Sequence, residues 1–240
     1  MRQRQFTSSV AMLVALAASV SNARALHHHG LISPRSRAAG FVSEVINPYF
    51  PLHPGTTFHY AGETDGVPST DDMEVTHTTK VIAGVTCTEV HDRVYTDGVL
   101  SEDTLDWYAQ DDAGNVWYFG EDTKELDPDG NVTSTEGTWQ AGVDGARQGI
   151  IMEASPHVGD KYQQEFSLGV AQDNAQVMSL DKSACVRYGC FDDLLLTKEW
   201  SPLEKGVVEQ KLYARGIGNI RVEVVKGGDE RSELVSITSD

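Results

Sequence analysis

Three short turn sequences divide residues 85–139 into segments of strand length. The turns are 96–98 (Thr-Asp-Gly), 111–115 (Asp-Asp-Ala-Gly-Asn) and 127–131 (Asp-Pro-Asp-Gly-Asn). Asp-Gly and Gly-Asn pairs supply the positive φ angles that tight β-hairpins require. The segments between the turns are rich in Val, Tyr, Trp, Thr and Phe, which favour strands. The pattern predicts an antiparallel β-meander and therefore an all-β fold.

Strand-like segments continue on both sides of this meander. Strands are predicted at 56–62, 74–82, 85–95, 99–110, 115–126, 132–140, 162–168, 175–180, 185–187, 194–201, 207–214, 219–225 and 233–238. Residues 63–73 are predicted to form an acidic loop, and 170–177 and 191–196 are candidates for short helices. We expect one all-β domain over residues 45–240, built as a single curved antiparallel sheet or half-barrel with few or short helices.

The first 25 residues have the features of a secretory signal peptide. Arg2 and Arg4 precede an apolar core at 10–20, and residues 23–25 (Ala-Arg-Ala) offer small side chains at a cleavage site. The apolar core is shorter than the roughly 20 residues that a membrane-spanning helix needs. We therefore expect a secreted or periplasmic protein with no membrane insertion. Residues 26–44, which begin with a run of three histidines at 27–29, are predicted to be a flexible leader.

The chain is strongly acidic, with 19 basic and 36 acidic residues. The signal peptide contains three arginines and no acidic residue, so residues 26–240 carry 16 basic and 36 acidic residues, a formal charge of −20. This charge repels nucleic acid, which we exclude as a partner, and it favours cations, cationic ligands or simple solubility.

Cysteine placement is compatible with an oxidising compartment. Cys185 and Cys190 flank four residues that form a plausible turn, so a bridge across a hairpin is possible. Cys87 lies in an alternating strand segment and is expected to be a buried free thiol.

Several motifs resemble those of a recurrent, mostly uncharacterised family of bacterial secreted proteins. They are 47–52 (NPYFPL) with 54–56 (PGT), 106–111 (DWYAQD), 115–120 (NVWYFG), and the pair 188–193 (YGCFDD) and 213–218 (YARGIG). The last pair is also similar to TapB-like periplasmic proteins, which are related in shape to half-barrel lipoprotein carriers such as LolA. The resemblance implies a strongly curved antiparallel sheet, and it implies no enzyme activity.

Aromatic residues on both faces of one strand suggest a ligand site. Because side chains alternate along a strand, Asp106 and Tyr108 share one face and Leu105 and Trp107 share the other. The simpler interpretation is that aromatic rings merely cover the outer face of the sheet. The leading hypothesis is a non-enzymatic secreted or periplasmic protein that holds a small apolar or amphipathic ligand on a concave face. The residues expected to bind it are Asp106, Trp107, Tyr108, Trp117, Phe119, Glu121 and Trp139.

Two alternative functions remain open. Asp127, Asp129 and Asn131 begin like a calcium loop, which makes calcium a possible cofactor of an acidic secreted module. The rest of that pattern fails, because Thr138 stands at the twelfth position, and a plain hairpin turn also explains the three residues. A carboxylate-based hydrolase or isomerase is the other alternative, and it would require Asp106 and Glu121 to face one pocket.

Overall fold

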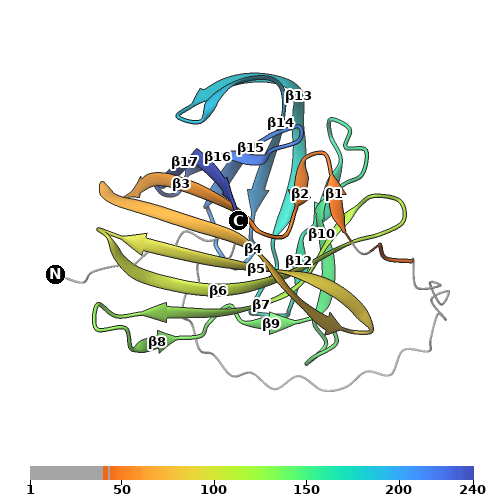
Figure 1. Ribbon diagram of the computed structural model, residues 1–240, viewed down its shortest axis with the longest axis horizontal. Coiled ribbons are helices and arrows are strands. Elements are labelled where there is room, and N and C mark those ends of the chain that lie inside the picture. Colours follow the sequence, from red (N-terminus) through yellow and green to blue (C-terminus); the bar gives the residue numbers. More distant parts are fainter. Residues whose placement is uncertain (1–39, 43) are drawn as a thin grey trace.

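The computed structural model describes residues 40–42 and 44–240, and within this part of the chain all regular structure is β-strand (Figure 1). The strands are β1 (Val45–Asn47), β2 (Phe50–Leu52), β3 (Thr56–Thr64), β4 (Val67–Ile82), β5 (Val85–Thr96), β6 (Val99–Gln110), β7 (Val116–Leu126), β8 (Val132–Ser134), β9 (Trp139–Gln140), β10 (Arg147–Met152), β11 (Lys161–Gln163), β12 (Glu165–Phe166), β13 (Asn174–Val186), β14 (Gly189–Trp200), β15 (Val208–Ala214), β16 (Gly218–Lys226) and β17 (Arg231–Ser239).

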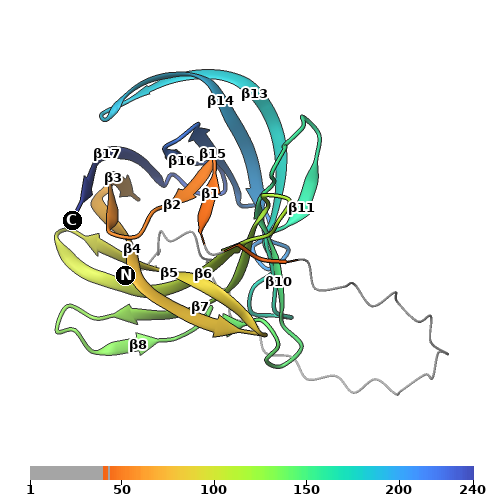
Figure 2. The same ribbon diagram turned by 45° about the vertical axis from the view of Figure 1, so that its right-hand side comes forward.

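One large antiparallel sheet contains all of these strands except β1 and β2. Its order is β11-β13-β14-β15-β16-β17-β3-β4-β5-β6-β7-β10-β12, and β8 and β9 also pair with β7. The sheet curls strongly but is not closed into a barrel (Figure 2). Its two outer strands, β11 and β12, are separated in the chain by Gln164 alone. The expected all-β class, with a large curved antiparallel sheet, is confirmed.

Several local predictions are wrong, among them the single strand at 132–140, which the structure divides into β8 and β9. Residues 63–73 form a hairpin between β3 and β4, not a loop, and its turn is made by Asp65 and Gly66 at φ 51° and 73°. Pro68 lies opposite Glu63 near this turn, where a strand end tolerates proline. The helix candidates 170–177 and 191–196 instead lead into β13 and lie within β14, respectively. Neither segment forms a helix, because the pairing between these two strands takes up backbone groups of 174–177 and 191–196, and the amides of Val170 and Ala171 donate to the Ser167 carbonyl.

The end of the predicted leader is bound to the sheet. Val42 donates its amide to the carbonyl of Gln110 at 2.9 Å, and the Gly40 carbonyl accepts the amide of Asp112 at 2.9 Å. Residues 40–42 are therefore not a free leader, contrary to expectation. The rest of the predicted leader up to residue 39, the signal peptide and residue 43 lie outside the described residues.

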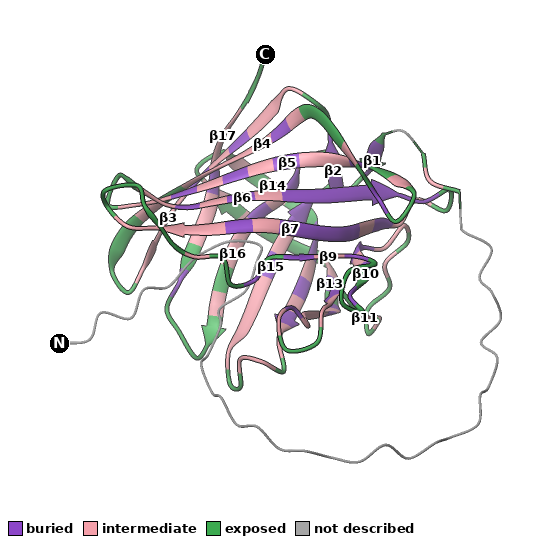
Figure 3. Ribbon diagram, turned by 90° about the horizontal axis from the view of Figure 1, so that it is seen from below, coloured by how far each residue is buried: buried purple, intermediate pink, exposed green. Residues whose placement is uncertain are grey.

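The β1–β2 hairpin lies inside the curve of the sheet (Figure 2). Its Phe50 ring packs on the Tyr108 ring of β6, with centroids 5.2 Å apart. The side-chain amide of Asn47 donates to the carbonyls of Gly114 and Glu153, and the Pro48 carbonyl accepts the amide of Gly216. The hairpin thus joins the turns at one end of the sheet. Its neighbours on β6 and β7 are buried over much of their length (Figure 3).

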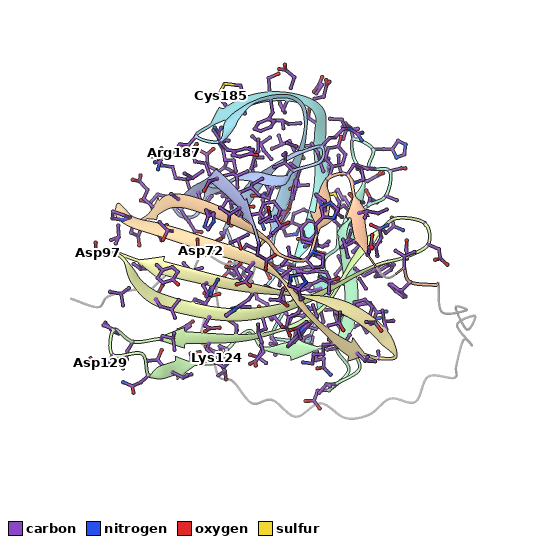
Figure 4. All side chains as sticks on the ribbon, viewed as in Figure 1. Asp72, Asp97, Lys124, Asp129, Cys185 and Arg187 are labelled. Atoms are coloured by element: carbon purple, nitrogen blue, oxygen red, sulfur yellow. A yellow bond between two sulfur atoms is a disulfide. The ribbon has the colours of Figure 1, made fainter. Side chains whose placement is uncertain are left out.

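Strands β13 and β14 form a long arm that arches over the sheet, with its tip at the disulfide between Cys185 and Cys190 (Figures 1 and 4). The tip is attached to β17, because Tyr188 donates its amide to the Leu234 carbonyl at 3.1 Å and Arg187 lies 3.1 Å from Glu233. The possible hairpin disulfide is therefore present, and Cys87 is a buried free thiol as expected.

Candidate functional site: an acidic inner face and an adjoining pocket

Matched polar residues face one another across β6 and β7. The register pairs Glu102 with Glu125, Thr104 with Thr123, Asp106 with Glu121, and Tyr108 with Tyr118. Alternation along each strand places these residues on one face, which is the inner face of the curved sheet. Almost all of them are buried, so the interior of this protein is lined by acids and hydroxyl groups as well as by apolar side chains.

An aromatic row crosses this inner face. It runs from Phe50 through Tyr108 and Tyr118 to Trp139, with successive ring centroids 5.2, 4.8 and 5.4 Å apart. Each end of the row is fixed, because Phe50 belongs to the inserted hairpin and the Trp139 indole N–H donates to a Glu165 carboxylate oxygen at 3.0 Å. Such aromatic pairs add specific geometry to the burial of apolar area.

Gly120 allows Trp139 to reach this row. Strand β9 pairs closely with β7 here, and a Cβ atom at residue 120 would lie 2.4 Å from the Trp139 carbonyl oxygen. Gly120 also has φ 139° and lies at a register shift between β6 and β7. The resulting bulge places Tyr118 and Glu121 on the same face although they are three residues apart.

Five acidic residues of the interior are at most 3% exposed: Asp92, Glu102, Asp106, Glu121 and Glu165. Burial, together with the charge of Asp92, raises the pKa of Glu102 and of Asp106 to about 8 in each case. Burial and the neighbouring Glu165 and Asp106 charges hold the pKa of Glu121 well above its ordinary value. These carboxyl groups therefore favour the neutral form at moderate pH.

Lys211 is the one buried cation among the described residues. Its ammonium lies 2.9 Å from Glu199 and 3.3 Å from Glu209, so two carboxylates already surround it. It stands on β15, across the interior from β6 and β7 in the order of the sheet. The acids of the β6–β7 face are thus left without a basic partner of their own.

Glu121 is the most exceptional of these acids. Neither of its carboxylate oxygens has a hydrogen-bond partner among the described residues, although the side chain is only 1% exposed. One oxygen of Glu165 is also without a partner. By contrast, Asp106 accepts a hydrogen bond of 2.5 Å from the Tyr118 hydroxyl. Unpartnered buried carboxylates are costly, so Glu121 needs either a proton or a ligand that donates to it.

A pocket of about 450 Å³ borders β7 and includes Glu121 in its lining, but the carboxylate oxygens of Glu121 are buried on the inner face and do not open into it. This volume falls within the range of small-molecule sites. Its lining combines two indole rings, exposed aliphatic side chains, three acids and one lysine. The residues are Lys80, Trp107, Glu121, Asp122, Thr138, Trp139, Gln140, Val143, Asp144, Ala146, Ser167, Leu168 and Val170. Val143 and Leu168 are 47% and 78% exposed, so the pocket has an apolar rim open to solvent.

The structure divides the seven residues predicted to bind a ligand. Trp107, Glu121 and Trp139 line the pocket, whereas Asp106 and Tyr108 lie on the inner face beside Glu121 and do not line it. The other two lie apart from the pocket. The Trp117 indole donates to Asp111 at 2.8 Å, and Phe119 packs on Phe41 with centroids 5.5 Å apart.

Sequence reasoning missed four residues of this region. Glu102, Tyr118 and Glu165 complete the inner face, and Lys80 reaches the pocket from β4 with its ammonium 3.3 Å from the centre of the Trp107 ring. The sequence signal for Tyr118 was Gly120, since a glycine inside a strand marks a bulge that changes which side chains share a face. Glu165 and Lys80 approach through long-range pairing, which leaves no local pattern.

The predicted metal ligands form a turn. Asp127 accepts hydrogen bonds from the amides of Asp129 and Asn131 and from the Asn131 side chain, at 2.9–3.2 Å. This turn lies at the far end of β7, near Asp129 in Figure 4. Among residues 40–42 and 44–240, no group of three or more His, Cys, Asp or Glu side chains is placed to hold a metal ion. Calcium binding remains a prediction, which a melting curve with and without chelator would test.

No protein-family model matches the chain, and no curated protein matches it. One solved structure that resembles it is described as "a putative lipoprotein from Parabacteroides distasonis". The two chains are 13% identical, the match covers 80% of this chain and 99% of the other, and the TM-score is 0.46. A likeness at this level says nothing about ligand or activity. In the part of the chain that the structure describes, no helix is long and apolar enough to cross a membrane.

Proposed function

We propose that this is a secreted or periplasmic, non-enzymatic binding protein that holds a small amphipathic ligand in the pocket beside Trp107 and Trp139. The observation that carries the proposal is the composition of that pocket: two indole rings and an exposed aliphatic rim adjoin carboxylates within about 450 Å³. The leader sequence supports export, and the disulfide at the arm tip suits an oxidising compartment.

The pocket is suited to a ligand with one apolar and one polar part. Val143, Leu168 and Val170 offer apolar contact at the rim, and Trp107 and Trp139, which are 3% and 4% exposed, add a small amount of aromatic surface to the lining. The apolar part of a ligand would cover side chains that are otherwise open to water, which is favourable by about 25 cal/mol for each Å² buried. The polar part would meet the acidic side of the lining.

A binding titration tests this proposal. Dodecyl maltoside and dodecyltrimethylammonium would be titrated below their micelle concentrations, with heat and tryptophan fluorescence as readouts. We expect saturable binding of at least one probe. Leu168→Asn should weaken it severalfold, whereas Val158→Asn, an equally mild change at a 63% exposed residue outside the pocket, should leave it within twofold. Binding of neither probe would contradict the proposal.

A carboxylate-based hydrolase or isomerase has weaker support. Asp106 and Glu121 are direct cross-strand neighbours, as that mechanism would need. However, Asp106 is engaged by the Tyr118 hydroxyl and does not line the pocket of about 450 Å³ where a substrate would fit. This alternative remains a prediction that the substitutions Asp106→Asn and Glu121→Gln would test against candidate glycosides.

A further inference from the structure

We propose that the groove beneath the tip of the β13–β14 arm is a second binding site, which takes a small zwitterion whose opposite charges lie about 7 Å apart. The groove has a volume of about 370 Å³, within the range of small-molecule sites. Its lining shares no residue with the pocket beside Trp107 and Trp139. The charged residues of the lining are Glu63, Arg187, Arg221, Glu223, Arg231 and Glu233.

The register of the sheet arranges five of these charged side chains in two rows. Arg221 of β16 lies opposite Glu233 of β17, whereas Glu223 lies opposite Arg231, which in turn lies opposite Glu63 of β3. The charged residues of β16, and likewise those of β17, are two positions apart, so all five side chains share one face of the sheet. Each residue advances a strand by about 3.3 Å, which places the two rows about 7 Å apart.

The row of Arg221 and Glu233 carries an excess of positive charge. The tip of the arm adds Arg187 to this row (Figure 4), with its Nε atom 3.1 Å from a Glu233 oxygen. One nitrogen of the Arg221 guanidinium lies 4.0 Å from the other Glu233 oxygen and donates to the Cys185 carbonyl. Because these contacts engage only one nitrogen of each arginine, further N–H donors remain for a ligand carboxylate.

The row of Glu223, Arg231 and Glu63 carries an excess of negative charge. Arg231 lies 3.1 Å from a Glu63 oxygen, so one acid of this row is already paired. Glu223 is exposed and forms no ion pair among the described residues. A ligand ammonium at this end of the groove would therefore meet a carboxylate that no basic side chain of the protein occupies.

The opposite signs of the two rows favour a ligand that carries both charges. A lone anion would be repelled by the second row and by a chain with 36 acidic and 19 basic residues. A lone cation would leave the two arginines of the first row unmatched. A zwitterion has no net charge, so the field of the whole protein does not oppose its approach. An extended dipeptide fits the spacing of the rows, because two residues span about 7 Å.

Three compounds with the same backbone separate the outcomes. Diglycine carries both terminal charges, N-acetyl-diglycine keeps only the carboxylate, and diglycinamide keeps only the ammonium. Each would be titrated at about pH 6.5, where terminal amines are charged, with the amide chemical shifts of β16, β17 and the arm tip as readout. We expect diglycine to bind about fivefold more tightly than either blocked compound. Equal binding of diglycine and a blocked compound, or saturable binding of none, would overturn the proposal.

Two substitutions at exposed side chains assign each charge to its row. Arg187→Gln should weaken the binding of diglycine and N-acetyl-diglycine and leave diglycinamide unchanged. Glu223→Gln should weaken the binding of diglycine and diglycinamide and leave N-acetyl-diglycine unchanged. Arg147→Gln and Glu136→Gln make the same chemical changes at exposed residues outside the groove, and they should leave all three affinities as in the wild type. A wild-type affinity for diglycine in either Arg187→Gln or Glu223→Gln would overturn the proposal.

Discussion

Asp111 and Asp127 close two turns of the chain with the same set of hydrogen bonds. Each accepts the amides of the residues two and four positions later and the side-chain amide of an asparagine. Each is also followed, three residues on, by a glycine with positive φ. They differ in burial, because Asp111 is 5% exposed and accepts a fourth hydrogen bond from Trp117. The repeated pattern explains 127–131 as a turn.

Asp111→Ala should destabilise the protein, whereas Asp127→Ala should have a smaller effect. Removing the Asp111 carboxylate leaves several partly buried donors without an acceptor, at a cost of about 2 kcal/mol in the free energy of unfolding. Burial opposes ionisation of Asp111, but the hydrogen bonds from Asn115, Trp117 and Ala113 outweigh it and lower its pKa. Its contribution is therefore present above the pKa of an unfolded aspartate and lost as pH falls below it. Urea unfolding measures both variants, and equal losses would contradict this account.

Lys211→Met tests the buried cation. The substitution leaves Glu199 and Glu209 without their shared cation, and removing one partner from a buried ion pair costs about 3–5 kcal/mol. Lys198→Met is the matched control, because Lys198 is only partly buried and lies over the Trp200 ring. Thermal or urea unfolding should show a large loss for the first variant and a small one for the second. Similar stability of the two variants would show that the buried ion pair does not contribute to the free energy of unfolding.

The strand elements could be predicted where they depend on local turn chemistry. The β5–β6 and β6–β7 hairpins follow from turns with Asp, Gly and Asn, and their predicted bounds agree closely with the structure. Residues 191–196 were harder to predict as a strand, because their apolar run is compatible with a helix until the pairing of this segment with β13 is known. The β3–β4 hairpin was missed because Gly66 and Pro68 suggested a longer loop than two residues.

The inner face of β6 could not be identified from the sequence. Glu102, Thr104 and Asp106 alternate with Asp103, Leu105 and Trp107, and the first set is the more polar. Alternation shows that the two sets lie on opposite faces but not which face is inside. A sequence reading normally places the acidic face in water. Here the curvature of the whole sheet and the inserted β1–β2 hairpin bury it.

Loss of the disulfide should loosen the β13–β14 arm only at its tip. The bond closes a loop of six residues, so its removal should cost about 2 kcal/mol in the chain-entropy account. In the variant with Cys185→Ser and Cys190→Ser, we expect amide exchange at Tyr188 to accelerate, because its bond to the Leu234 carbonyl holds the tip. Amides of β15 and β16 should keep their protection. Loss of protection in those strands would show that the arm tip supports the sheet more widely.

At the scale of the whole molecule, the buried acids make stability depend on pH. Glu102 faces Asp92, Asp106 and Glu125, and burial and these charges raise its pKa to about 8 in the folded protein. An unfolded glutamate ionises near pH 4.3. Between these values the folded state binds more protons than the unfolded state, so the free energy of unfolding falls as pH rises. Asp106 acts in the same direction, with burial and the Asp92 charge raising its pKa to about 8.

We therefore expect the protein to be most stable at mildly acidic pH and to lose a few kcal/mol between about pH 5 and pH 8, since each unit of pKa shift corresponds to roughly 1.4 kcal/mol. Above the folded-state pKa values the loss should level off, because both states are then ionised. Glu102→Gln removes one of the titrating groups and should flatten the slope, whereas Glu136→Gln at the exposed surface should not. Urea unfolding at pH 5, 7 and 9 measures the slope for each protein. A free energy of unfolding that stays constant or rises from pH 5 to pH 8 would mean that the inner acids are hydrated in solution, so that water supplies the two carboxylate oxygens of Glu121 with hydrogen-bond partners.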